Sequence, residues 1–476
     1  MEYEIVMGIE VHAELSTRSK IYCGCSTEFG GEPNTHCCPI CTGMPGVLPV
    51  LNKSVVEYAV KAGLAMNCTI SRFSKQDRKN YFYPDLPKAY QVSQFDLPLC
   101  QNGYVEIETG GVRKKIGITR IHIEEDAGKL MLDEWDTGTL VDYNRCGVPL
   151  IEIVSEPDMR SPEEARAFVE NIKAILEYLD VCDCKMQEGS LRADVNLSVR
   201  PVGSSTFGTR TEMKNLNSFR SIQRAAENEA QRQIRELEDG GRILQETRRW
   251  DDTKGFSYAM RSKEEAHDYR YFPEPDLVPV VVDDEWLSRI SGTLPELPAA
   301  RRERYIKDFG LPEYDAGLLT SSKRLADFFE EAARENSNSK SISNWIMGDL
   351  MRLLKEKELE VDAIPFPGSY LAQLVSLIDS GTISGTIARK VFEKMFESGR
   401  EPGRIVKEEG LEVVSDEGAL GAAVRKILDA NPQSVADYKN GKEKAFGFLV
   451  GQAMREMKGR ADPQTINRLL KEELAK

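Results

Sequence analysis

The segment CGCSTEFGGEPNTHCCPIC, residues 23–41, holds five of the ten cysteines of the chain. Cys23 and Cys25 form one pair, Cys38 and Cys41 form a second, and twelve residues separate the two pairs. Two pairs at this spacing are typical of a tetrahedral zinc site with four thiolate ligands. Because four protein ligands leave no coordination position open, we predict a structural zinc ion that fixes the following loop, GMPGVLP.

Two alternatives to this ligand set stay open. Cys37 or His36 could displace one of the four ligands, or the cysteines could be buried without any metal. Disulfides are less favoured, because we expect the chain to stay in a reducing cytosol. Its first residues, MEYEIVMGIEVH, lack the plan of a signal peptide, and no stretch approaches the roughly 20 apolar residues of a membrane span.

Charged residues recur at every second position in three segments that alternate as β-strands do. The segments are GIEVHAEL, LRADVNLSVR and TRTEMKN, and the residues between the charges are mostly apolar. A strand face that only meets water needs no such density of acids, arginines and histidine, although a solvated face with incidental salt bridges is the alternative. The residues predicted to share the charged face include Glu10, His12, Arg192, Asp194, Arg200, Arg210 and Glu212.

A run of three acids, Glu124 to Asp126, ends a further alternating segment, RIHIEEDAG. Carboxylates with one histidine can hold Mg²⁺, and arginines beside them can clamp phosphate oxygens. The pattern therefore predicts magnesium-assisted phosphoryl transfer. The chain has neither G-x-x-x-x-G-K-[ST] nor G-x-G-x-x-G, so a nucleotide would have to bind to the charged face of the sheet.

The residue patterns divide the chain into three parts with an α+β fold. Residues 1–292 mix strands and helices, and residues 293–404 carry apolar residues at helical spacing and end in an expected linker, SGREPGR at 398–404. Residues 405–476 form a short helical tail. Capping residues predict helices at 161–179 and 218–241. With 41% hydrophobic and 29% charged residues, the 476-residue chain is typical of a soluble protein with several domains.

Several long motifs follow one another over nearly the whole chain, among them GIEVHAEL, YFYPDLPKAYQVSQFDLP, IHIEEDAGK, DYNRCGVPLIEIVSEPD, MQEGSLRADVNLSVR, GTRTEMKNLNSF and RSKEEAHDYRYFPEPDL. Together they resemble the GatB family, which comprises the GatB subunits of the aspartyl/glutamyl-tRNA amidotransferases. The segment CPICTGMPGVLP resembles the zinc knuckle of that family and the loop after it.

The resemblance implies a large, mostly antiparallel cradle domain with the fold of glutamine synthetase, a helical domain and a tail that contacts the tRNA body. It implies that ATP phosphorylates the side-chain carboxylate of Glu-tRNA(Gln), and often of Asp-tRNA(Asn), before ammonia displaces the phosphate. The ammonia would reach the site through a channel from a separate amidase subunit, and a small third subunit would join the other two. Such a ligase is cytoplasmic and uses ATP, Mg²⁺ and a structural Zn²⁺.

On this resemblance we assign roles to the charged residues as hypotheses. Strict alternation places Glu125 on the face of Ile121 and Ile123, so a bulge or the end of the strand must turn it towards His12. The expected catalytic residues are Glu125, His12, Glu10, Lys79 and Lys88. The expected magnesium ligands are His12, Glu10, Glu125, Asp194 and Glu212. The expected ATP-binding residues are Arg192, Arg200, Arg210 and Glu124.

The segment KNYFYPDLPK carries two lysines, Lys79 and Lys88, that are expected to line the ammonia route, as family members suggest. A buried lysine there could be partly neutral and accept a proton from ammonium. Tyr81 and Tyr83 of the same segment could face the tRNA end or lie in the core. The histidines expected to be only structural are His122 and His267.

The net charge of −14 is unusual for a protein that binds tRNA, because phosphate contacts dominate such affinity. Residues 405–476 carry 12 basic and 12 acidic side chains, so the excess of acid lies in residues 1–404. The tail is therefore the less repulsive place to meet tRNA, and we expect modest, salt-sensitive affinity.

Two other function classes stay open. The first is a non-catalytic, zinc-containing tRNA-binding subunit, which the acidic sheet face disfavours and which predicts no ATP turnover. The second is an ATP-dependent ligase that acts on a free amino acid and carries its own ammonia source. The sequence shows no convincing glutaminase Cys/His pair and no amidase serine–lysine cluster, so the nitrogen source is expected on a partner chain.

Overall fold

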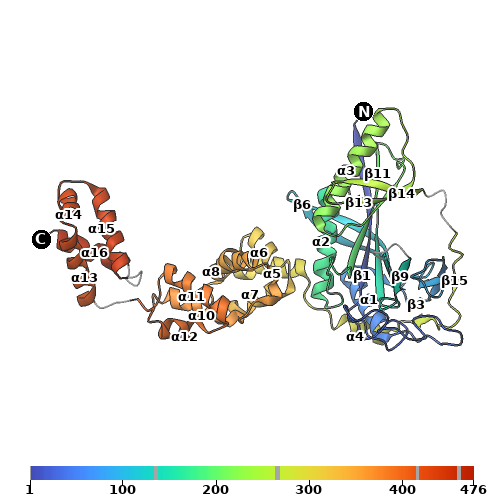
Figure 1. Ribbon diagram of the computed structural model, residues 1–476, viewed down its shortest axis with the longest axis horizontal. Coiled ribbons are helices and arrows are strands. Elements are labelled where there is room, and N and C mark those ends of the chain that lie inside the picture. Colours follow the sequence, from blue (N-terminus) through green and yellow to red (C-terminus); the bar gives the residue numbers. More distant parts are fainter. Residues whose placement is uncertain (1, 133–137, 263–267, 414–416, 458–462, 476) are drawn as a thin grey trace. The chain divides into compact units, whose positions relative to one another are not determined.

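The computed structural model describes residues 2–132, 138–262, 268–413, 417–457 and 463–475 (Figure 1). Backbone contacts divide the chain into two compact units, Met1–Leu297 and Pro298–Lys476. The first unit is built on β-sheets and the second is helical, so the mixed α+β fold expected from the sequence is confirmed. His267, which was expected to be structural, lies outside the described residues.

The largest sheet of the first unit has the strand order β14-β13-β12-β11-β1-β10-β7-β6-β2. Its neighbouring strands are antiparallel except for the parallel pair β12 and β13, as a mostly antiparallel sheet was expected. Its strands are β1 Tyr3–Glu14, β2 Thr69–Ile70, β6 Cys100–Thr109, β7 Val112–Glu125, β10 Pro149–Ser155, β11 Leu191–Pro201, β12 Thr211–Lys214, β13 Glu246–Asp251 and β14 Phe256–Ser262.

The central strand β1 alternates as its sequence predicts. Ile9, Val11 and Ala13 are buried in the core, whereas Glu10 and His12 point to the opposite face and are only half-buried. Burying a side chain the size of isoleucine or valine contributes about 1.5–3 kcal/mol. Since a slip of one residue would bury the charged set instead, this apolar row fixes the register on which the charged face depends.

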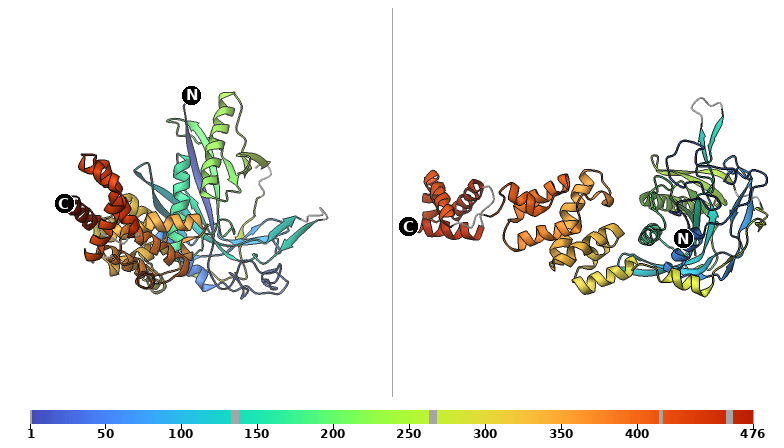
Figure 2. Two further views of the ribbon diagram at one scale, coloured as in Figure 1. Left: turned by 60° about the vertical axis from the view of Figure 1, so that its left-hand side comes forward. Right: turned by 90° about the horizontal axis from the view of Figure 1, so that it is seen from below.

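Helices α1, α2 and α3 cover the apolar face of the large sheet. Helix α2 (Pro162–Tyr178) begins after Ser161 and α3 (Phe219–Glu238) begins after Ser218, and each serine side chain accepts a backbone hydrogen bond from the first turn. Figures 1 and 2 show α2 and α3 side by side, and α1 (Lys53–Ala65) packs against β6 and β7. Both helices expected in this part of the chain are confirmed.

A smaller sheet, β15-β4-β5, lies on the side of the large sheet opposite α2 (Figure 1). It joins segments that are far apart in the sequence, because β15 pairs with β4. The remaining strands form the pairs β16-β3 and β8-β9. These strands are β3 Phe73–Ser74, β4 Asp77–Asn80, β5 Tyr90–Ser93, β8 Lys129–Leu132, β9 Thr139–Asp142, β15 Phe272–Pro273 and β16 Val280–Val281.

All secondary-structure elements described in the second unit are helices, joined by loops. Helix α4 (Asp284–Ser291) is the last helix of the first unit. Helices α13 to α16 share a separate apolar core that includes Leu420, Leu449 and Ile466. The helices are α5 Pro298–Phe309, α6 Glu313–Leu319, α7 Lys323–Glu335, α8 Ser339–Trp345, α9 Met351–Glu356, α10 Gly368–Asp379, α11 Gly385–Ser398, α12 Pro402–Glu408, α13 Glu417–Ala430, α14 Pro432–Lys439, α15 Glu443–Glu456 and α16 Pro463–Leu474. The division of this unit at residue 404 stays a prediction.

Candidate active site and cysteine cluster

The charged face of the large sheet gathers side chains from neighbouring strands. In the pairing of β1 with β10, His12 lies opposite Glu152. In the pairing of β1 with β11, His12 lies opposite Arg192 and Glu10 lies opposite Asp194. Because directly opposite residues of antiparallel strands project from the same face, the register alone brings these charges together.

A first cluster consists of His12, Glu124 and Glu152. The Nε2 atom of His12 lies 3.5 Å from Glu124 Oε1 and 3.6 Å from Glu152 Oε2. The buried His122 lies beside them, with its Nε2 atom 3.3 Å from Glu152 Oε2. Burial opposes its charge, but Glu152 and Glu124 outweigh burial and raise the pKa of His122 to about 9. The contacts of His122 Nε2 with Glu152 at 3.3 Å and with Glu124 at 3.7 Å hold the two carboxylates beside His12.

A second cluster consists of Glu10, Asp194 and Glu212, each of which has an oxygen within 4.8 Å of the other two. Burial, together with repulsion from Glu152, Asp194 and Glu212, raises the pKa of Glu10. The Nζ atom of Lys214 lies 2.6 Å from Asp194 and 3.1 Å from Glu212. Three carboxylates thus gather around one another, and oxygen donors of this kind fit a hard cation such as Mg²⁺.

Glu125 joins neither cluster. The alternation of β7 continues unbroken through its last two residues, so Glu124 faces His12 and Glu125 faces the other way. The Glu125 carboxylate accepts a hydrogen bond of 2.8 Å from the Val92 amide and forms an ion pair with Lys88. A bulge or the end of the strand was expected to turn Glu125 towards His12. In the described pairing of β7 with β10, the register shifts between Val154 and Ser155, which is the end far from Glu125. No bulge therefore turns Glu125 towards His12 in this described pairing.

The two lysines expected on the ammonia route lie in different places. Lys88 pairs with Glu125, whereas Lys79 lies near Glu124 and Glu152 on the charged face. Burial opposes the charge on each lysine, but Glu125 raises the pKa of Lys88 and Glu124 is the largest of the charges that raise the pKa of Lys79. These charges favour the protonated form of both lysines, and a partly neutral lysine on the ammonia route stays a prediction.

The four cysteines predicted to bind zinc come together. The Sγ atoms of Cys23, Cys25, Cys38 and Cys41 all lie within 4.8 Å of one another. The Sγ atom of Cys41 is 3.3 Å from Cys23 Sγ and 3.7 Å from each of the other two. These separations approach the about 3.8 Å between ligands of a tetrahedral site with Zn–S bonds of about 2.3 Å. Cys37 lies outside the group, with its Sγ atom facing a backbone carbonyl, so the geometry fits the predicted ligand set.

Comparison with known proteins covers both units. Residues 5–288 match the family described as the GatB/GatE catalytic domain, and residues 327–474 match the family described as the GatB domain. The GatB subunit of the aspartyl/glutamyl-tRNA(Asn/Gln) amidotransferase of Caldicellulosiruptor bescii is 66% identical, with 100% of both chains covered. Proteins of the same name from Thermoanaerobacter sp. (strain X514) and Lachnoclostridium phytofermentans are 64% and 61% identical, over 100% of this chain and 100% and 99% of theirs. The chain belongs to the GatB family.

As a member of the GatB family, the chain is part of an ATP-dependent ligase that performs tRNA-dependent amidation in protein biosynthesis. Among its described residues, no helix has the length and apolar character that crossing a membrane requires.

Two of the three arginines expected to bind ATP form ion pairs with acids of other segments. Arg192 donates to Asp126 at 2.9 Å, and Arg200 donates to Glu4 at 2.7 Å. Arg210 is exposed, and no ion pair of its guanidinium is found within the part of the chain that the structure describes. Of the three, Arg210 is therefore the side chain most available to a phosphate.

A cavity of about 260 Å³ adjoins Arg210 on the charged face. Gly8 precedes Glu10 on the same face of β1 and contributes no side chain, which leaves room above the strand. The other walls combine polar and apolar groups, as a nucleoside requires. They include Ser155, Pro157, Asn196, Ser198 and Phe207.

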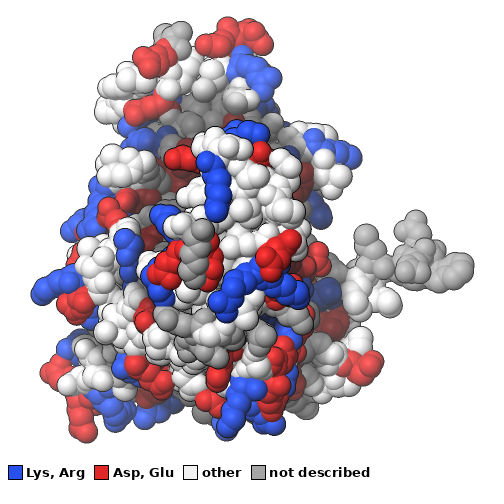
Figure 3. Space-filling model, turned by 90° about the vertical axis from the view of Figure 1, so that its left-hand side faces the viewer, with Lys and Arg blue, Asp and Glu red and all other residues white. Residues whose placement is uncertain are grey.

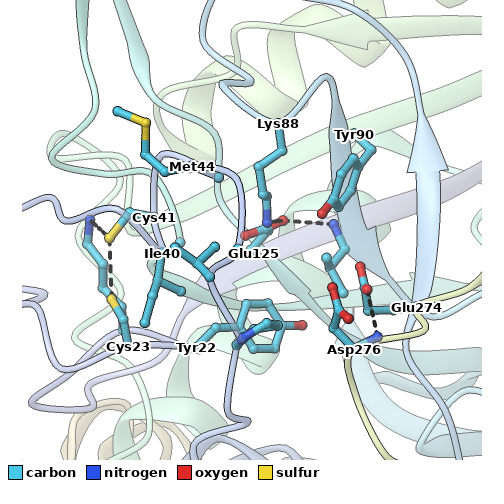
Figure 4. A pocket seen from close by; sticks show the side chains of 17 residues that line it. Tyr22, Cys23, Ile40, Cys41, Met44, Lys88, Tyr90, Glu125, Glu274 and Asp276 are labelled. Atoms are coloured by element: carbon cyan, nitrogen blue, oxygen red, sulfur yellow. Dashed lines mark hydrogen bonds and ion pairs between the residues drawn. The ribbon is translucent and has the colours of Figure 1, made fainter.

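A second cavity, of about 150 Å³, lies between the cysteine cluster and the Lys88–Glu125 pair. Figure 4 shows Lys88 and Glu125 on one side of it and Cys23 and Cys41 on the other. The residues that also line it include Lys20, Tyr22, Met44, Tyr90, Glu274 and Asp276. The cysteine cluster and the Lys88–Glu125 ion pair thus line the same cavity.

Glu152 is a site residue that the sequence predictions did not include. It lies in PLIEIVS between the buried residues Ile151 and Ile153. This is the same alternation that singled out Glu10 and His12 in GIEVHAEL, so the signal was present in the sequence.

Proposed function

We propose that the chain activates the side-chain carboxylate of an aminoacyl-tRNA with ATP and then transfers the activated acyl group to ammonia. The names of its relatives specify the aspartyl and glutamyl esters of tRNA(Asn) and tRNA(Gln), and we infer one or both as substrates here. The observation that carries the proposal is the convergence of acids with one imidazole on a single sheet face, at Glu10, His12, Glu124, Glu152, Asp194 and Glu212.

Both clusters suit magnesium. His12, Glu124 and Glu152 would hold one ion, and Glu10, Asp194 and Glu212 would hold a second. Bound there, Mg²⁺ would neutralise charge on the phosphoryl group during its transfer. Lys214 and His122 supply fixed positive charge next to the carboxylates and keep their oxygens turned towards a common centre.

ATP itself would bind along the charged face without a phosphate loop, as in the glutamine synthetase fold that the resemblance to the GatB family implies. The exposed guanidinium of Arg210 supports a role in gripping phosphate oxygens. The cavity above Gly8 leads from Arg210 to Glu10 and has the mixed lining that a nucleoside needs. The γ-phosphate would then lie over the acidic clusters, within reach of the carboxylate that attacks it.

Phosphorylation of the substrate carboxylate supplies a leaving group for the attack by ammonia. Oxide is too basic to leave a carboxylate, whereas phosphate leaves an acyl phosphate readily when ammonia attacks the acyl carbon. Because water would compete for the same carbon, the site should admit ammonia and exclude water. The buried Lys88–Glu125 pair and the cavity beside it support an ammonia route at this place, with Lys79 at its end near the charged face.

The ammonia is expected from a partner amidase subunit, to which a small third subunit attaches, and the tail of this chain is expected to contact the tRNA body. We also infer a cytosolic location, because a tetrathiolate zinc site needs reduced cysteines.

The test uses the chain assembled with its partner subunits. Wild-type enzyme with Mg-ATP and hydroxylamine should yield a hydroxamate on Glu-tRNA or Asp-tRNA, which reports the acyl phosphate. Glu152→Gln should lower this trapping about 100-fold or more, because it weakens the site that would hold Mg²⁺ to neutralise charge on the transferring phosphoryl group. Glu125→Gln should keep the trapping but lose amide formation from glutamine, since it disturbs the ammonia route only.

Glu106→Gln, on the exposed part of β6, serves as the matched control and should behave as wild type. Wild-type trapping by Glu152→Gln would contradict the assignment of the clusters. Product from free glutamate without tRNA would favour a free amino-acid ligase instead, and absence of ATP turnover in the wild type would favour a non-catalytic tRNA-binding subunit.

A further inference from the structure

Five aromatic rings form a continuous chain on the small sheet β15-β4-β5 and its flanking loops. They come from two segments far apart in the sequence and touch in the order Tyr83, Tyr81, Tyr269, Tyr271 and Phe95. Successive ring centroids are 6.3, 5.7, 6.1 and 4.3 Å apart. The first three contacts are edge-to-face, whereas Phe95 and Tyr271 are stacked with an interplanar angle of 8°.

This aromatic chain is not part of a core. Phe95 is 57% exposed, Tyr83 is 48% exposed and Tyr269 is 37% exposed. The backbone beneath the rings is nevertheless fixed. The Asn80 amide donates to the Tyr269 carbonyl at 2.9 Å, and the Phe95 amide donates to Asp77 at 2.9 Å. Exposed rings on a fixed backbone offer flat faces to a ligand at little cost in conformational entropy.

The aromatic chain adjoins the carboxylates of the active site through the segment that carries Phe95. The Ser93 hydroxyl, two residues before Phe95, donates to Glu124 Oε2 at 3.3 Å. On the ring side, the Nζ atom of Lys79 lies 5.0 Å from the ring centroid of Tyr269 and 5.7 Å from that of Tyr81. The aromatic chain therefore lies next to the cluster that contains His12 and Glu124.

We propose that this aromatic chain is a stacking platform for the unpaired 3′-terminal nucleotide of the aminoacyl-tRNA. The inference rests on the proposed function and adds the place where the acceptor end binds. Single-stranded ends are recognised by stacking of splayed bases on aromatic side chains. The face of Phe95 that is turned away from Tyr271 can extend their stack by one base, and Lys79 can attract the terminal phosphate or the substrate carboxylate.

Connectivity within the substrate favours this occupant over a partner protein. The carboxylate to be activated is attached through the amino acid to the terminal ribose, so the terminal base must lie a short distance from the acidic clusters. The aromatic chain meets this requirement, because Ser93, which contacts Glu124, is only two residues before Phe95. A protein interface has no such need to adjoin the carboxylates.

The test measures the affinity of the assembled amidotransferase for deacylated tRNA(Gln), either intact or lacking its 3′-terminal nucleotide. With wild type, removal of that nucleotide should weaken binding about 5- to 100-fold, as loss of one base–aromatic stack does. Phe95→Ala should bind intact tRNA as weakly as wild type binds the truncated tRNA, and truncation should then cost nothing further. Phe95→Trp should restore the difference.

Phe73→Ala, which is 51% exposed on the pair β16-β3, is the matched control and should retain the full effect of truncation. The proposal is wrong if Phe95→Ala binds both tRNAs as wild type does, or if it weakens both equally. It is also wrong if Phe95→Ala fails to assemble with the partner subunits in size-exclusion chromatography, since the rings would then form a protein interface. A wild type that distinguishes the two tRNAs but forms no amide would refute the proposed function and leave the platform intact.

Discussion

At the scale of single residues, Lys20 is buried beside the cysteine cluster. It is 1% exposed, and its Nζ atom lies 3.7 Å from Cys41 Sγ and 3.5 Å from the Tyr143 carbonyl oxygen. Burying an ammonium is costly unless its charge is compensated. The Cys23 thiol, aided by the charge of Lys20, lowers the pKa of the Cys41 thiol. Since four thiolates around Zn²⁺ carry net negative charge, Lys20 is placed to compensate it.

Lys20→Met should therefore weaken zinc binding, by about 10- to 100-fold as for other residues that support a metal ligand. Competition with a chromogenic chelator measures this change in the assembled protein. Lys115→Met, an exposed lysine of β7, is the control and should leave the zinc affinity unchanged. Equal zinc retention by both variants would show that the lysine does not support the site.

At the scale of elements, α3 is joined to the charged strands by a buried carboxylate. Glu229 is 0% exposed and accepts hydrogen bonds from Thr211 at 2.8 Å, from Arg232 at 2.7 and 2.9 Å, and from Gln233 at 2.9 Å. Burial opposes its ionisation, but these donors and the charge of Arg232 outweigh burial and lower the pKa of Glu229. Thr211 opens β12, so this network ties the helix to the strand that carries Glu212.

Glu229→Gln should destabilise the contact of α3 with the sheet by about 1–3 kcal/mol, because Arg232 loses its charged partner and one of the two acceptor oxygens becomes an NH₂ donor. Hydrogen exchange of the α3 amides should quicken accordingly. Because folding lowers the pKa of Glu229, its ionised carboxylate stabilises the folded state at pH values above its ordinary pKa of 4.5. This stabilisation is lost as the pH falls through the folded-state pKa. The difference from wild type should therefore be full at pH 7 and shrink below pH 4.5. Glu238→Gln, at the exposed end of α3, should show no difference at either pH.

At the scale of the whole molecule, charge limits how tRNA can bind. The chain carries 63 basic and 77 acidic residues, and the face drawn in Figure 3 mixes blue and red side chains. A phosphate contact on this face would form close to acids that oppose it. Recognition must then rely on a few well-placed contacts and on the acceptor end, since RNA helices expose little base-specific surface to side chains.

We expect the Kd for tRNA to rise about 10- to 100-fold between 100 and 400 mM KCl, which corresponds to a small number of released counterions. Filter binding over a salt series measures the slope. An affinity that does not change with salt would contradict a binding mode built on phosphate contacts.

Much of the site could be predicted because it depends on local rules. Period-two alternation in β1 and β11 placed Glu10, His12 and Asp194 on one face, and the paired cysteines identified a cluster that the fold brings together. Serine caps gave the starts of α2 and α3. The long motifs predicted the family that the comparisons confirm.

Other features depend on contacts between distant segments, and no local pattern contains them. The alternation of β7 was predicted correctly from its sequence. The expected turn of Glu125 towards His12 required a bulge near the end of the strand, but the pairing of β7 with β10 places the register shift elsewhere. Arg192 and Arg200 share the predicted face, but acids from other segments, Asp126 and Glu4, occupy them. The aromatic chain exists only because β15 pairs with β4.

The sequence by itself determined which side of each strand is charged, because side-chain direction follows from a two-residue repeat and from the need to bury the apolar set. It also identified the four cysteines that the fold brings together, and the family. Only the tertiary structure decided which charges meet: Glu152 with His12, Lys88 with Glu125, and Lys79 with the aromatic rings. The reason is that Coulomb energy and stacking depend on distances of a few ångströms across strands, and strand register and pairing set those distances.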